Sequence, residues 1–193
     1  MSRLDRLLAG ILWCLGVLFT AAAIHILAVF NLPKLLGKDP YSRLSALAKT
    51  GEMTVLPSAG AGTGWAPFAD PALAQGACLY DLSREPMRLT AETDSDRMLT
   101  LSFRTPAGDI FYSMTDRAAQ HGKIDVLILT ADQLENLEAE TDDDDEAPQE
   151  LRLVAPTTKG FVLVNALAAF PSERLEAEQR VKAIRCAPEG ASG

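Results

Sequence analysis

The longest apolar run of the chain lies near its beginning. Residues 7–30 contain no charged side chain. A helix of this length rises about 36 Å at about 1.5 Å per residue, which exceeds a hydrocarbon core of about 30 Å. Asn31 and Pro33 follow the run, and proline removes a backbone donor from a helix. The pattern therefore predicts a transmembrane helix from Leu7 to Phe30 that ends by Pro33.

The same run shares features with a secretory signal peptide. Two arginines precede it, and Ala21 and Ala23 form an Ala-x-Ala pattern, so cleavage after Ala23 is the alternative to an anchor. The run continues beyond Ala23 to Phe30, which is longer than the usual apolar region of a signal peptide. This length favours an uncleaved anchor that is preceded by a short tail at residues 1–6.

The segment between this helix and the first predicted strand, residues 31–76, has a different composition. Asp39 and Pro40 match a helix N-cap and a first helical residue, and Gly51 matches a helix end, so we expect a short juxtamembrane helix. Residues 57–71 are rich in Gly, Ala and Pro and are typical of an extended linker. The alternating glycines there are a weak phosphate-loop signal. Because no strand and helix surround them, we favour the linker.

From Ala77 onward the apolar residues recur with a period of two, which is typical of half-buried strands. Residues 98–103 and 110–112 flank a turn at residues 106–108 and form the clearest hairpin. The other predicted strands cover residues 78–82, 87–89, 124–130, 151–154 and 161–164.

A helix closes the predicted domain. Pro171 opens it, and apolar residues then recur on one helical face. We therefore expect a mainly β, α+β domain at residues 77–186, which is either an antiparallel sandwich or a curved sheet with a C-terminal helix. Residues 187–193 are predicted to form a disordered tail.

The net charge of −8 is concentrated in one segment. Residues 135–150 contain nine acids and no base, including five consecutive carboxylates at residues 142–146. Because like charges repel, we expect a solvated acidic loop; the less favoured alternative is a calcium site, which would need spaced acids and a turn glycine. The rest of the chain has no basic patch, which argues against nucleic acid as a partner. No cofactor or metal is expected.

The cysteines help to predict in which cellular compartment the domain lies. Cys14 lies in the apolar run, whereas Cys78 and Cys186 lie near the two ends of the predicted domain. In an oxidising compartment these two would form one disulfide, and in the cytosol they would be buried thiols. Basic residues flank both ends of the run and do not decide its orientation. Because long domains translocate largely regardless of charge, we favour a cytoplasmic tail at residues 1–6, a domain outside the membrane and a disulfide.

The soluble part holds none of the familiar catalytic motifs. Its one histidine, His121, precedes Gly122 and is predicted to lie at the C-terminal end of a short helix after Asp116. The candidates for lining a polar ligand pocket on one sheet face are Tyr80, Asp81, Arg104, Tyr112, Asp116 and Arg117. The alternative, which we favour, is structural: cross-strand pairing with an acid for Arg104 and helix capping for Asp116.

Two stretches of the domain resemble a known family. Residues 78–83, Cys-Leu-Tyr-Asp-Leu-Ser, followed by Pro86, Asp96 and Arg97, are similar to the opening of the bacterial domain of unknown function 1254 family. Residues 153–156 and 161–165 resemble the end of the same domain. The resemblance implies a β-rich envelope domain, here in a small, membrane-anchored version that lacks the second domain of larger members. It brings no established catalytic residues.

These observations favour a single-pass protein of the bacterial inner membrane with a periplasmic domain that acts as a non-enzymatic binding or accessory module. The lipid bilayer is its expected partner, through Leu7 to Phe30. One alternative is an envelope enzyme, hydrolytic in type, with a pocket on a sheet face. The other is a small subunit of a membrane complex; Gly16 and Thr20 offer a small-xxx-small contact for a membrane protein partner, although this pattern is common by chance.

Overall fold

The computed structural model describes residues 3–36, 39–58, 69–93, 97–140 and 150–191. The chain forms two compact units, Met1–Lys38 and Asp39–Gly193. The first unit is helix α1, Arg3–Leu36, which contains the candidate membrane span Leu4–Asn31. An 18-residue window of this span has a mean hydropathy of 2.3 and is 0 % buried. The predicted apolar helix is confirmed, but its predicted end is wrong, because α1 continues past Pro33 to Leu36. A membrane anchor and a signal sequence are both compatible with such a helix.

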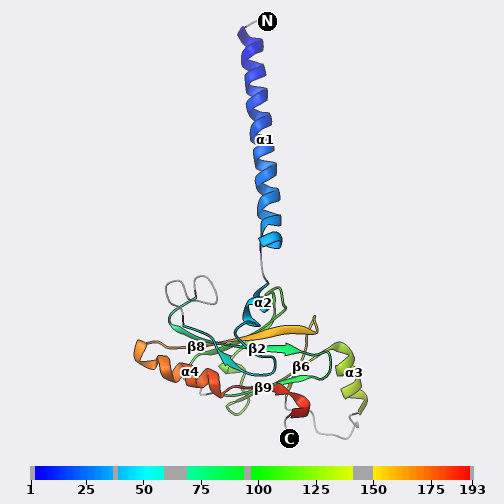
Figure 1. Cartoon of the computed structure of the whole chain (residues 1–193), viewed down its shortest axis with the longest axis vertical. Coiled ribbons are helices and arrows are strands. Elements are labelled where there is room, and N and C mark those ends of the chain that lie inside the picture. Colours follow the sequence, from blue (N-terminus) through cyan, green and yellow to red (C-terminus); the bar gives the residue numbers. More distant parts are fainter. Residues whose placement is uncertain (1–2, 37–38, 59–68, 94–96, 141–149, 192–193) are drawn as a thin grey trace. The chain divides into compact units, whose positions relative to one another are not determined.

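The second unit contains two β-sheets (Figure 1). In sheet A the strands follow the order β1 (Thr54–Val55), β2 (Leu73–Asp81), β8 (Lys159–Leu167), β4 (Leu99–Arg104) and β5 (Ile110–Thr115), all antiparallel. In sheet B the order is β7 (Leu151–Val154), β6 (Lys123–Leu129), β3 (Met87–Glu92) and β9 (Arg185–Pro188). The helices are α2 (Pro40–Leu44), α3 (Ala131–Glu140) and α4 (Arg174–Ala183), with short 3-10 helices η1 (Asp116–Ala118), η2 (Pro171–Glu173) and η3 (Glu189–Ala191). The predicted mainly β, α+β fold is confirmed.

The main core lies between the two sheets. Alternate residues of each strand point into it, so Phe103 and Val162 of sheet A and Val126 of sheet B are all 0 % exposed. Helix α4 completes this core and packs against β1, β2 and β8. It approaches β2 so closely that a β-carbon at Gly76 would collide with Val181 of α4.

The Cys78–Cys186 disulfide crosses this core from β2 to β9. Its Cα atoms are 6.5 Å apart, and Cys78 is fully buried. The sequence separation of the two cysteines is 108 residues, and closing a loop of that size stabilises a fold by about 4 to 5 kcal/mol in the chain-entropy model. The predicted pair is confirmed, and it holds the two sheets together at the strands β2 and β9.

The folded domain begins earlier than predicted. Asp39 caps α2 by accepting a 2.7 Å hydrogen bond from the Ser42 backbone, as its sequence indicates. Leu44 of this helix is 0 % exposed and packs on the outer face of sheet A against Leu79 and Phe161. The predicted juxtamembrane helix is therefore part of the domain, because its apolar residues cover a second, smaller core. The glycines of the predicted linker lie outside the described residues.

The chain after Cys186 is also structured, contrary to the predicted tail at residues 187–193. Strand β9 pairs with β3 through Pro188, and the side chain of Glu189 then forms an ion pair with Arg88. These backbone and side-chain bonds order residues 187–191. The last two residues lie outside the described part of the chain.

The predicted acidic loop at residues 135–150 is helical over its first part. Helix α3 runs to Glu140, and Thr130 and Gln133 form a reciprocal cap at its start, with hydrogen bonds of 3.2 Å and 2.9 Å. The connection that contains α3 joins β6 to β7, which are parallel, so the all-antiparallel prediction is wrong for this pair. Residues 141–149, with the consecutive carboxylates, lie outside the described residues.

The sequence predicted that His121 lies at the end of a helix, and this prediction is wrong. It lies with Gly122 in a two-residue turn closed by hydrogen bonds of 2.9 Å and 3.0 Å between Gln120 and Lys123. The φ angles are 53° for His121 and 78° for Gly122, and positive values at both central residues are those of a type I′ hairpin turn. The helix predicted before it is the single 3-10 turn η1.

Candidate functional site

Tyr80, one of the six candidate pocket residues, serves to hold sheet A together. It is 0 % exposed, and its hydroxyl donates a hydrogen bond to the backbone oxygen of Arg104 over 3.2 Å. The side chain crosses Gly160 of β8 to reach β4, and a β-carbon at Gly160 would collide with it. Burial raises the pKa of the Tyr80 hydroxyl above its usual range. Tyr80 therefore joins β2 to β4 across β8 and is not exposed to a ligand.

Asp81 holds the turn that follows β2. Its Oδ1 accepts hydrogen bonds from the Ser83 hydroxyl at 2.6 Å and the Ser83 backbone at 3.1 Å. Its Oδ2 lies 3.2 Å from the Lys159 ammonium. The hydrogen bonds from Ser83, assisted by Lys159, lower the pKa of Asp81 below its usual range.

Within the residues that the structure describes, Arg104 makes no ion pair with an acid across the hairpin, contrary to the prediction. Its guanidinium donates to the Ser102 hydroxyl at 3.2 Å and to the backbone oxygen of Gly108 at 3.3 Å. Partial burial lowers the pKa of Arg104. A bulge between Phe103 and Arg104 shifts the register of the hairpin, so that Arg104 pairs with Ile110.

The last three candidates lie near the end of β5. The ring of Tyr112 is 6.0 Å from that of Phe103. Asp116 is 8 % exposed but does not cap a helix, because Thr115 occupies the N-cap position of η1. Arg117 is exposed. Of the six candidates, Tyr112 lines the pocket described next, and the hydrogen bonds above assign structural roles to Tyr80, Asp81 and Arg104.

A pocket of about 580 Å³ opens at the side of the sandwich where β5 and β7 end the two sheets. Its apolar lining comes from three strands: Met114 of β5, Ile124 of β6 and Leu151 of β7. The remaining lining residues are Tyr112, Ala118, Gln120, His121, Lys123 and Asp125. The pocket thus combines an apolar part, which continues the core, with a polar rim from the His121 turn.

Asp125 connects this rim to a network of charges on the outer face of sheet B. Arg88 lies in the middle of the network, with its guanidinium 2.9 Å from Asp125, 3.4 Å from Glu150 and 2.7 Å from Glu189. The hydrogen bonds that Arg88 donates to the Glu189 carboxylate are the largest cause of a raised Arg88 pKa. Lys123 binds the second oxygen of Asp125 at 2.9 Å.

Sequence reasoning missed both the pocket and the charge network. The partners of Arg88 lie 37 to 101 residues away along the chain, so no local pattern brings them together. One local signal for the pocket was present: histidine followed by glycine tolerates the positive φ angles of a two-residue hairpin turn better than most residue pairs.

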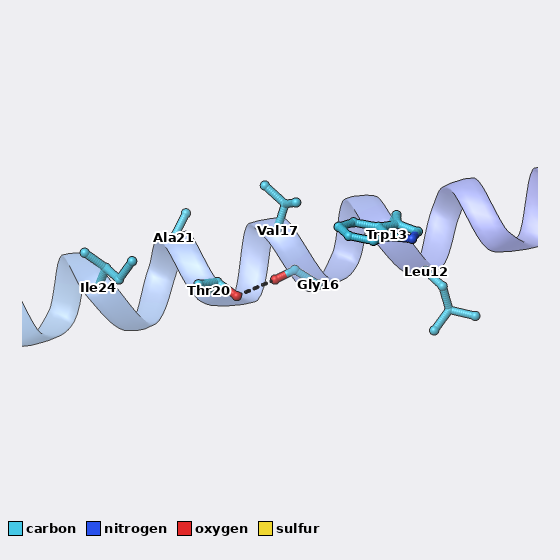
Figure 2. Close-up of a pocket in the computed structure, with 7 residues that line it drawn as sticks. All are labelled: Leu12, Trp13, Gly16, Val17, Thr20, Ala21 and Ile24. Atoms are coloured by element: carbon cyan, nitrogen blue, oxygen red, sulfur yellow. Dashed lines mark hydrogen bonds between the residues drawn. The ribbon is translucent and has the colours of Figure 1, made fainter.

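A shallow hollow lies along α1 in the first unit. Figure 2 shows its lining, which is Leu12, Trp13, Gly16, Val17, Thr20, Ala21 and Ile24. The Thr20 hydroxyl donates a 2.8 Å hydrogen bond to the Gly16 backbone oxygen, so the helix itself satisfies this polar group. The predicted small-xxx-small pair therefore lies on one face of α1.

Comparisons with known proteins give the fold and no family. No protein-family model matches the chain, and no curated protein matches it. The VPA0106 protein from Vibrio parahaemolyticus is similar over 78 % of this chain and 34 % of its own, with a TM-score of 0.55 and 9 % identity. An uncharacterized protein from Burkholderia cenocepacia is similar over 71 % of this chain and 36 % of its own, with a TM-score of 0.43 and 13 % identity. The chain spans about a third of the length of each, and the first likeness shows the fold alone.

Proposed function

We propose that this chain is a single-pass protein of the bacterial cell envelope, anchored in the inner membrane by α1, with its sandwich domain in the periplasm. In this role the domain is a non-enzymatic binding or accessory module. The observation that carries the proposal is the Cys78–Cys186 disulfide, because disulfides form and persist in oxidising compartments.

The properties of α1 support an anchor. Its candidate membrane span, Leu4–Asn31, is 28 residues long, which is more than the roughly 20 residues that a membrane span needs. None of this part is buried by the protein. Large apolar side chains such as Trp13 and Phe19, both 77 % exposed, therefore need an apolar environment, and the lipid bilayer supplies it. The bilayer is the first partner that we propose.

The pocket between β5 and β7 supports a binding role. A hydrolase of the kind that uses two carboxylates needs both to converge on one substrate. Within the described residues, Asp125 is the carboxylate that lines this pocket, and Arg88 and Lys123 neutralise it. This arrangement favours binding over carboxylate-based hydrolysis.

We also propose membership of the domain of unknown function 1254 family, on the two stretches that resemble it. The first stretch contains Tyr80 and Asp81, which tie β2 to neighbouring strands. In the second stretch, residues 161–165 belong to β8, and residues 153–156 begin in β7 of sheet B. The parts in β2 and β8 therefore lie on paired strands of sheet A.

A reporter fused to Gly193 tests the topology. An enzyme that is active only outside the cytoplasm should be active in this fusion, and a reporter that works only inside should be inactive in the parallel fusion. Deleting residues 3–30 should reverse both results, because the deletion removes the apolar helix that we propose leads the chain across the membrane. An immunoblot with an N-terminal tag reports whether α1 is retained.

An inactive outside reporter, at a protein level equal to that of the active inside reporter, would refute the periplasmic location. Loss of the N-terminal tag from the exported fusion would instead show that α1 is a cleaved signal sequence, and the anchor would be refuted while the location stands.

The hollow on α1 favours a second candidate, a small subunit of a membrane complex. Close packing of membrane helices uses small residues at the contact, and Gly16 with Thr20 provides such a surface. Purification in mild detergent should then retain a membrane protein partner. Gly16→Leu should remove that partner, whereas Gly10→Leu, a matched glycine outside the hollow, should not. Purification of the native chain without a partner would rule this candidate out.

A further inference from the structure

The pocket between β5 and β7 has the size and position of a ligand site. Its volume of about 580 Å³ lies within the roughly 300 to 1,000 Å³ of small-molecule pockets. Met114 pairs with Leu101 of the core, and Leu151 pairs with Val126, so both side chains face the space between the sheets. Ile124, 2 % exposed, lies beside them. The core of the sandwich thus extends as an apolar surface to its open side.

The turn at His121 builds the polar side of the pocket. Among the described residues His121 is the non-glycine residue with a positive φ angle, 53°. A type I′ turn requires such an angle at both central residues, and histidine tolerates it better than most residues. The turn places His121 and Lys123 together in the lining. The Lys123 ammonium rests on Asp125 at the outer face of sheet B, at the rim of the pocket, and its flexible side chain has to turn toward the apolar surface to meet a ligand there.

The charges at the rim leave Lys123 free to change partner. Its ammonium pairs with Asp125 at 2.9 Å, but the same carboxylate also binds Arg88 at 2.9 Å. If Lys123 turns to another anion, Asp125 keeps a cation and stays neutralised. The Lys123 side chain is 56 % exposed, and a pair so exposed is weak and easily exchanged.

From this combination we infer that the pocket binds a small carboxylate with an apolar body, an aryl or short acyl acid. The body lies on Met114, Ile124 and Leu151, and the carboxylate accepts hydrogen bonds from Lys123 and His121. This inference rests on the proposed binding function and names its ligand class.

Methyl NMR of the full chain tests it with 3-phenylpropionate as the probe. Labelling the methyl groups of the five methionines provides three reporters that this test uses: Met114 in the pocket, Met98, which is 43 % exposed, and Met87, which is 2 % exposed. In detergent, 3-phenylpropionate should shift the Met114 signal saturably. The Met98 signal should not move, and an unchanged Met87 signal reports an intact core. Equal, unsaturable shifts of Met98 and Met114 would mean that the probe binds without specificity, and the inference would fall.

Two substitutions test the role of charge. Lys123→Gln should weaken binding of the probe about tenfold, the usual effect of losing one charge-assisted hydrogen bond. Lys159→Gln is the matched control, because Lys159 is also 56 % exposed and pairs with one carboxylate, Asp81. Equal affinities of the two variants would overturn the proposed role of Lys123.

The neutral analogue 3-phenylpropionamide separates this inference from the proposed function. Binding of the amide as tightly as the acid would leave the pocket as a binding site but refute the carboxylate class. If neither probe moves Met114, both the inference and this pocket's part in the proposed binding function fall. The topology experiment on the Gly193 fusions is unaffected by either result.

Discussion

The two sides of the sandwich are built in opposite ways. On one side β2 and β9 are joined by the Cys78–Cys186 disulfide, and α4 packs over β1, β2 and β8. On the other side β5 and β7 leave a pocket between the sheets. Because the disulfide and α4 hold the two sheets together at one side, the fold does not need close packing between β5 and β7 at the other side. We therefore expect stability to depend on the closed side and ligand binding on the open side.

The largest expected effect is the loss of the disulfide. Cys186→Ser should lower the free energy of unfolding by about 2 to 5 kcal/mol, because the reduced chain has more conformational freedom when unfolded. Chemical denaturation of the full chain in detergent measures this change. Cys14→Ser is the control and should have no effect, since Cys14 lies outside the domain. Equal stabilities of the two variants would show that the stability of the domain does not depend on the disulfide side of the sandwich.

The next largest effect is expected at Gly160. A methyl group there would meet the Tyr80 hydroxyl and the backbone oxygen of Arg104, so Gly160→Ala should destabilise the domain by about 1 to 3 kcal/mol. Gly122→Ala is a useful comparison, because its nearest neighbour is at 3.5 Å and the penalty there comes from its φ of 78° alone. Tyr80→Phe combined with Gly160→Ala should recover little of the loss, because the ring carbon Cζ and the Arg104 backbone oxygen would still meet the added methyl group, as a thermal or denaturant midpoint would show.

A smaller effect is expected at the open side. Leu151 is 37 % exposed at the edge strand β7, so Leu151→Gln should change the free energy of unfolding by no more than about 0.5 kcal/mol. The same substitution should weaken binding of 3-phenylpropionate, because it removes part of the apolar surface. A large loss of stability in Leu151→Gln would show that the two sides do not differ as we describe.

The smallest effect concerns pH and the end of β2. The pKa of Asp81 is lower in the folded chain than its usual value of 3.8, because Ser83 and Lys159 stabilise the carboxylate. The folded state therefore gains from the ionised form above pH 3.8, and this gain is lost as the pH falls through the lowered pKa. Denaturant midpoints of Asp81→Asn and the native chain should differ at pH 6 and converge in acid. A difference between the two midpoints that stays the same at all pH values would show that folding does not lower the pKa of Asp81.

Local sequence patterns predicted the elements better than their partners. The apolar helix, the β4 and β5 hairpin, α4 and the disulfide all follow from periodicity, turn residues and the number of cysteines. The acidic run predicted a loop where the second half of α3 lies, although the cap formed by Thr130 and Gln133 is a helix-start signal. Repulsion among the acids therefore does not prevent a helix that such a cap starts.

Contacts between distant segments could not be read from local patterns. The pairing of β9 with β3 and the bond from Arg88 to Glu189 join segments about 100 residues apart. The pocket likewise needs three strands and one turn, and its lining residues are individually ordinary. The six predicted candidates were selected for their chemistry, whereas their structural roles depend on neighbours such as Gly160.

Trapping the thiols in intact cells tests the central claim most directly. In a chain that carries Cys14→Ser, the remaining cysteines are Cys78 and Cys186. Cells are quenched in acid and treated under denaturing conditions with a thiol reagent that adds mass. Our account predicts no mass addition before reduction and two additions after it, because the sandwich is closed by the disulfide. Two additions without any reduction would contradict it.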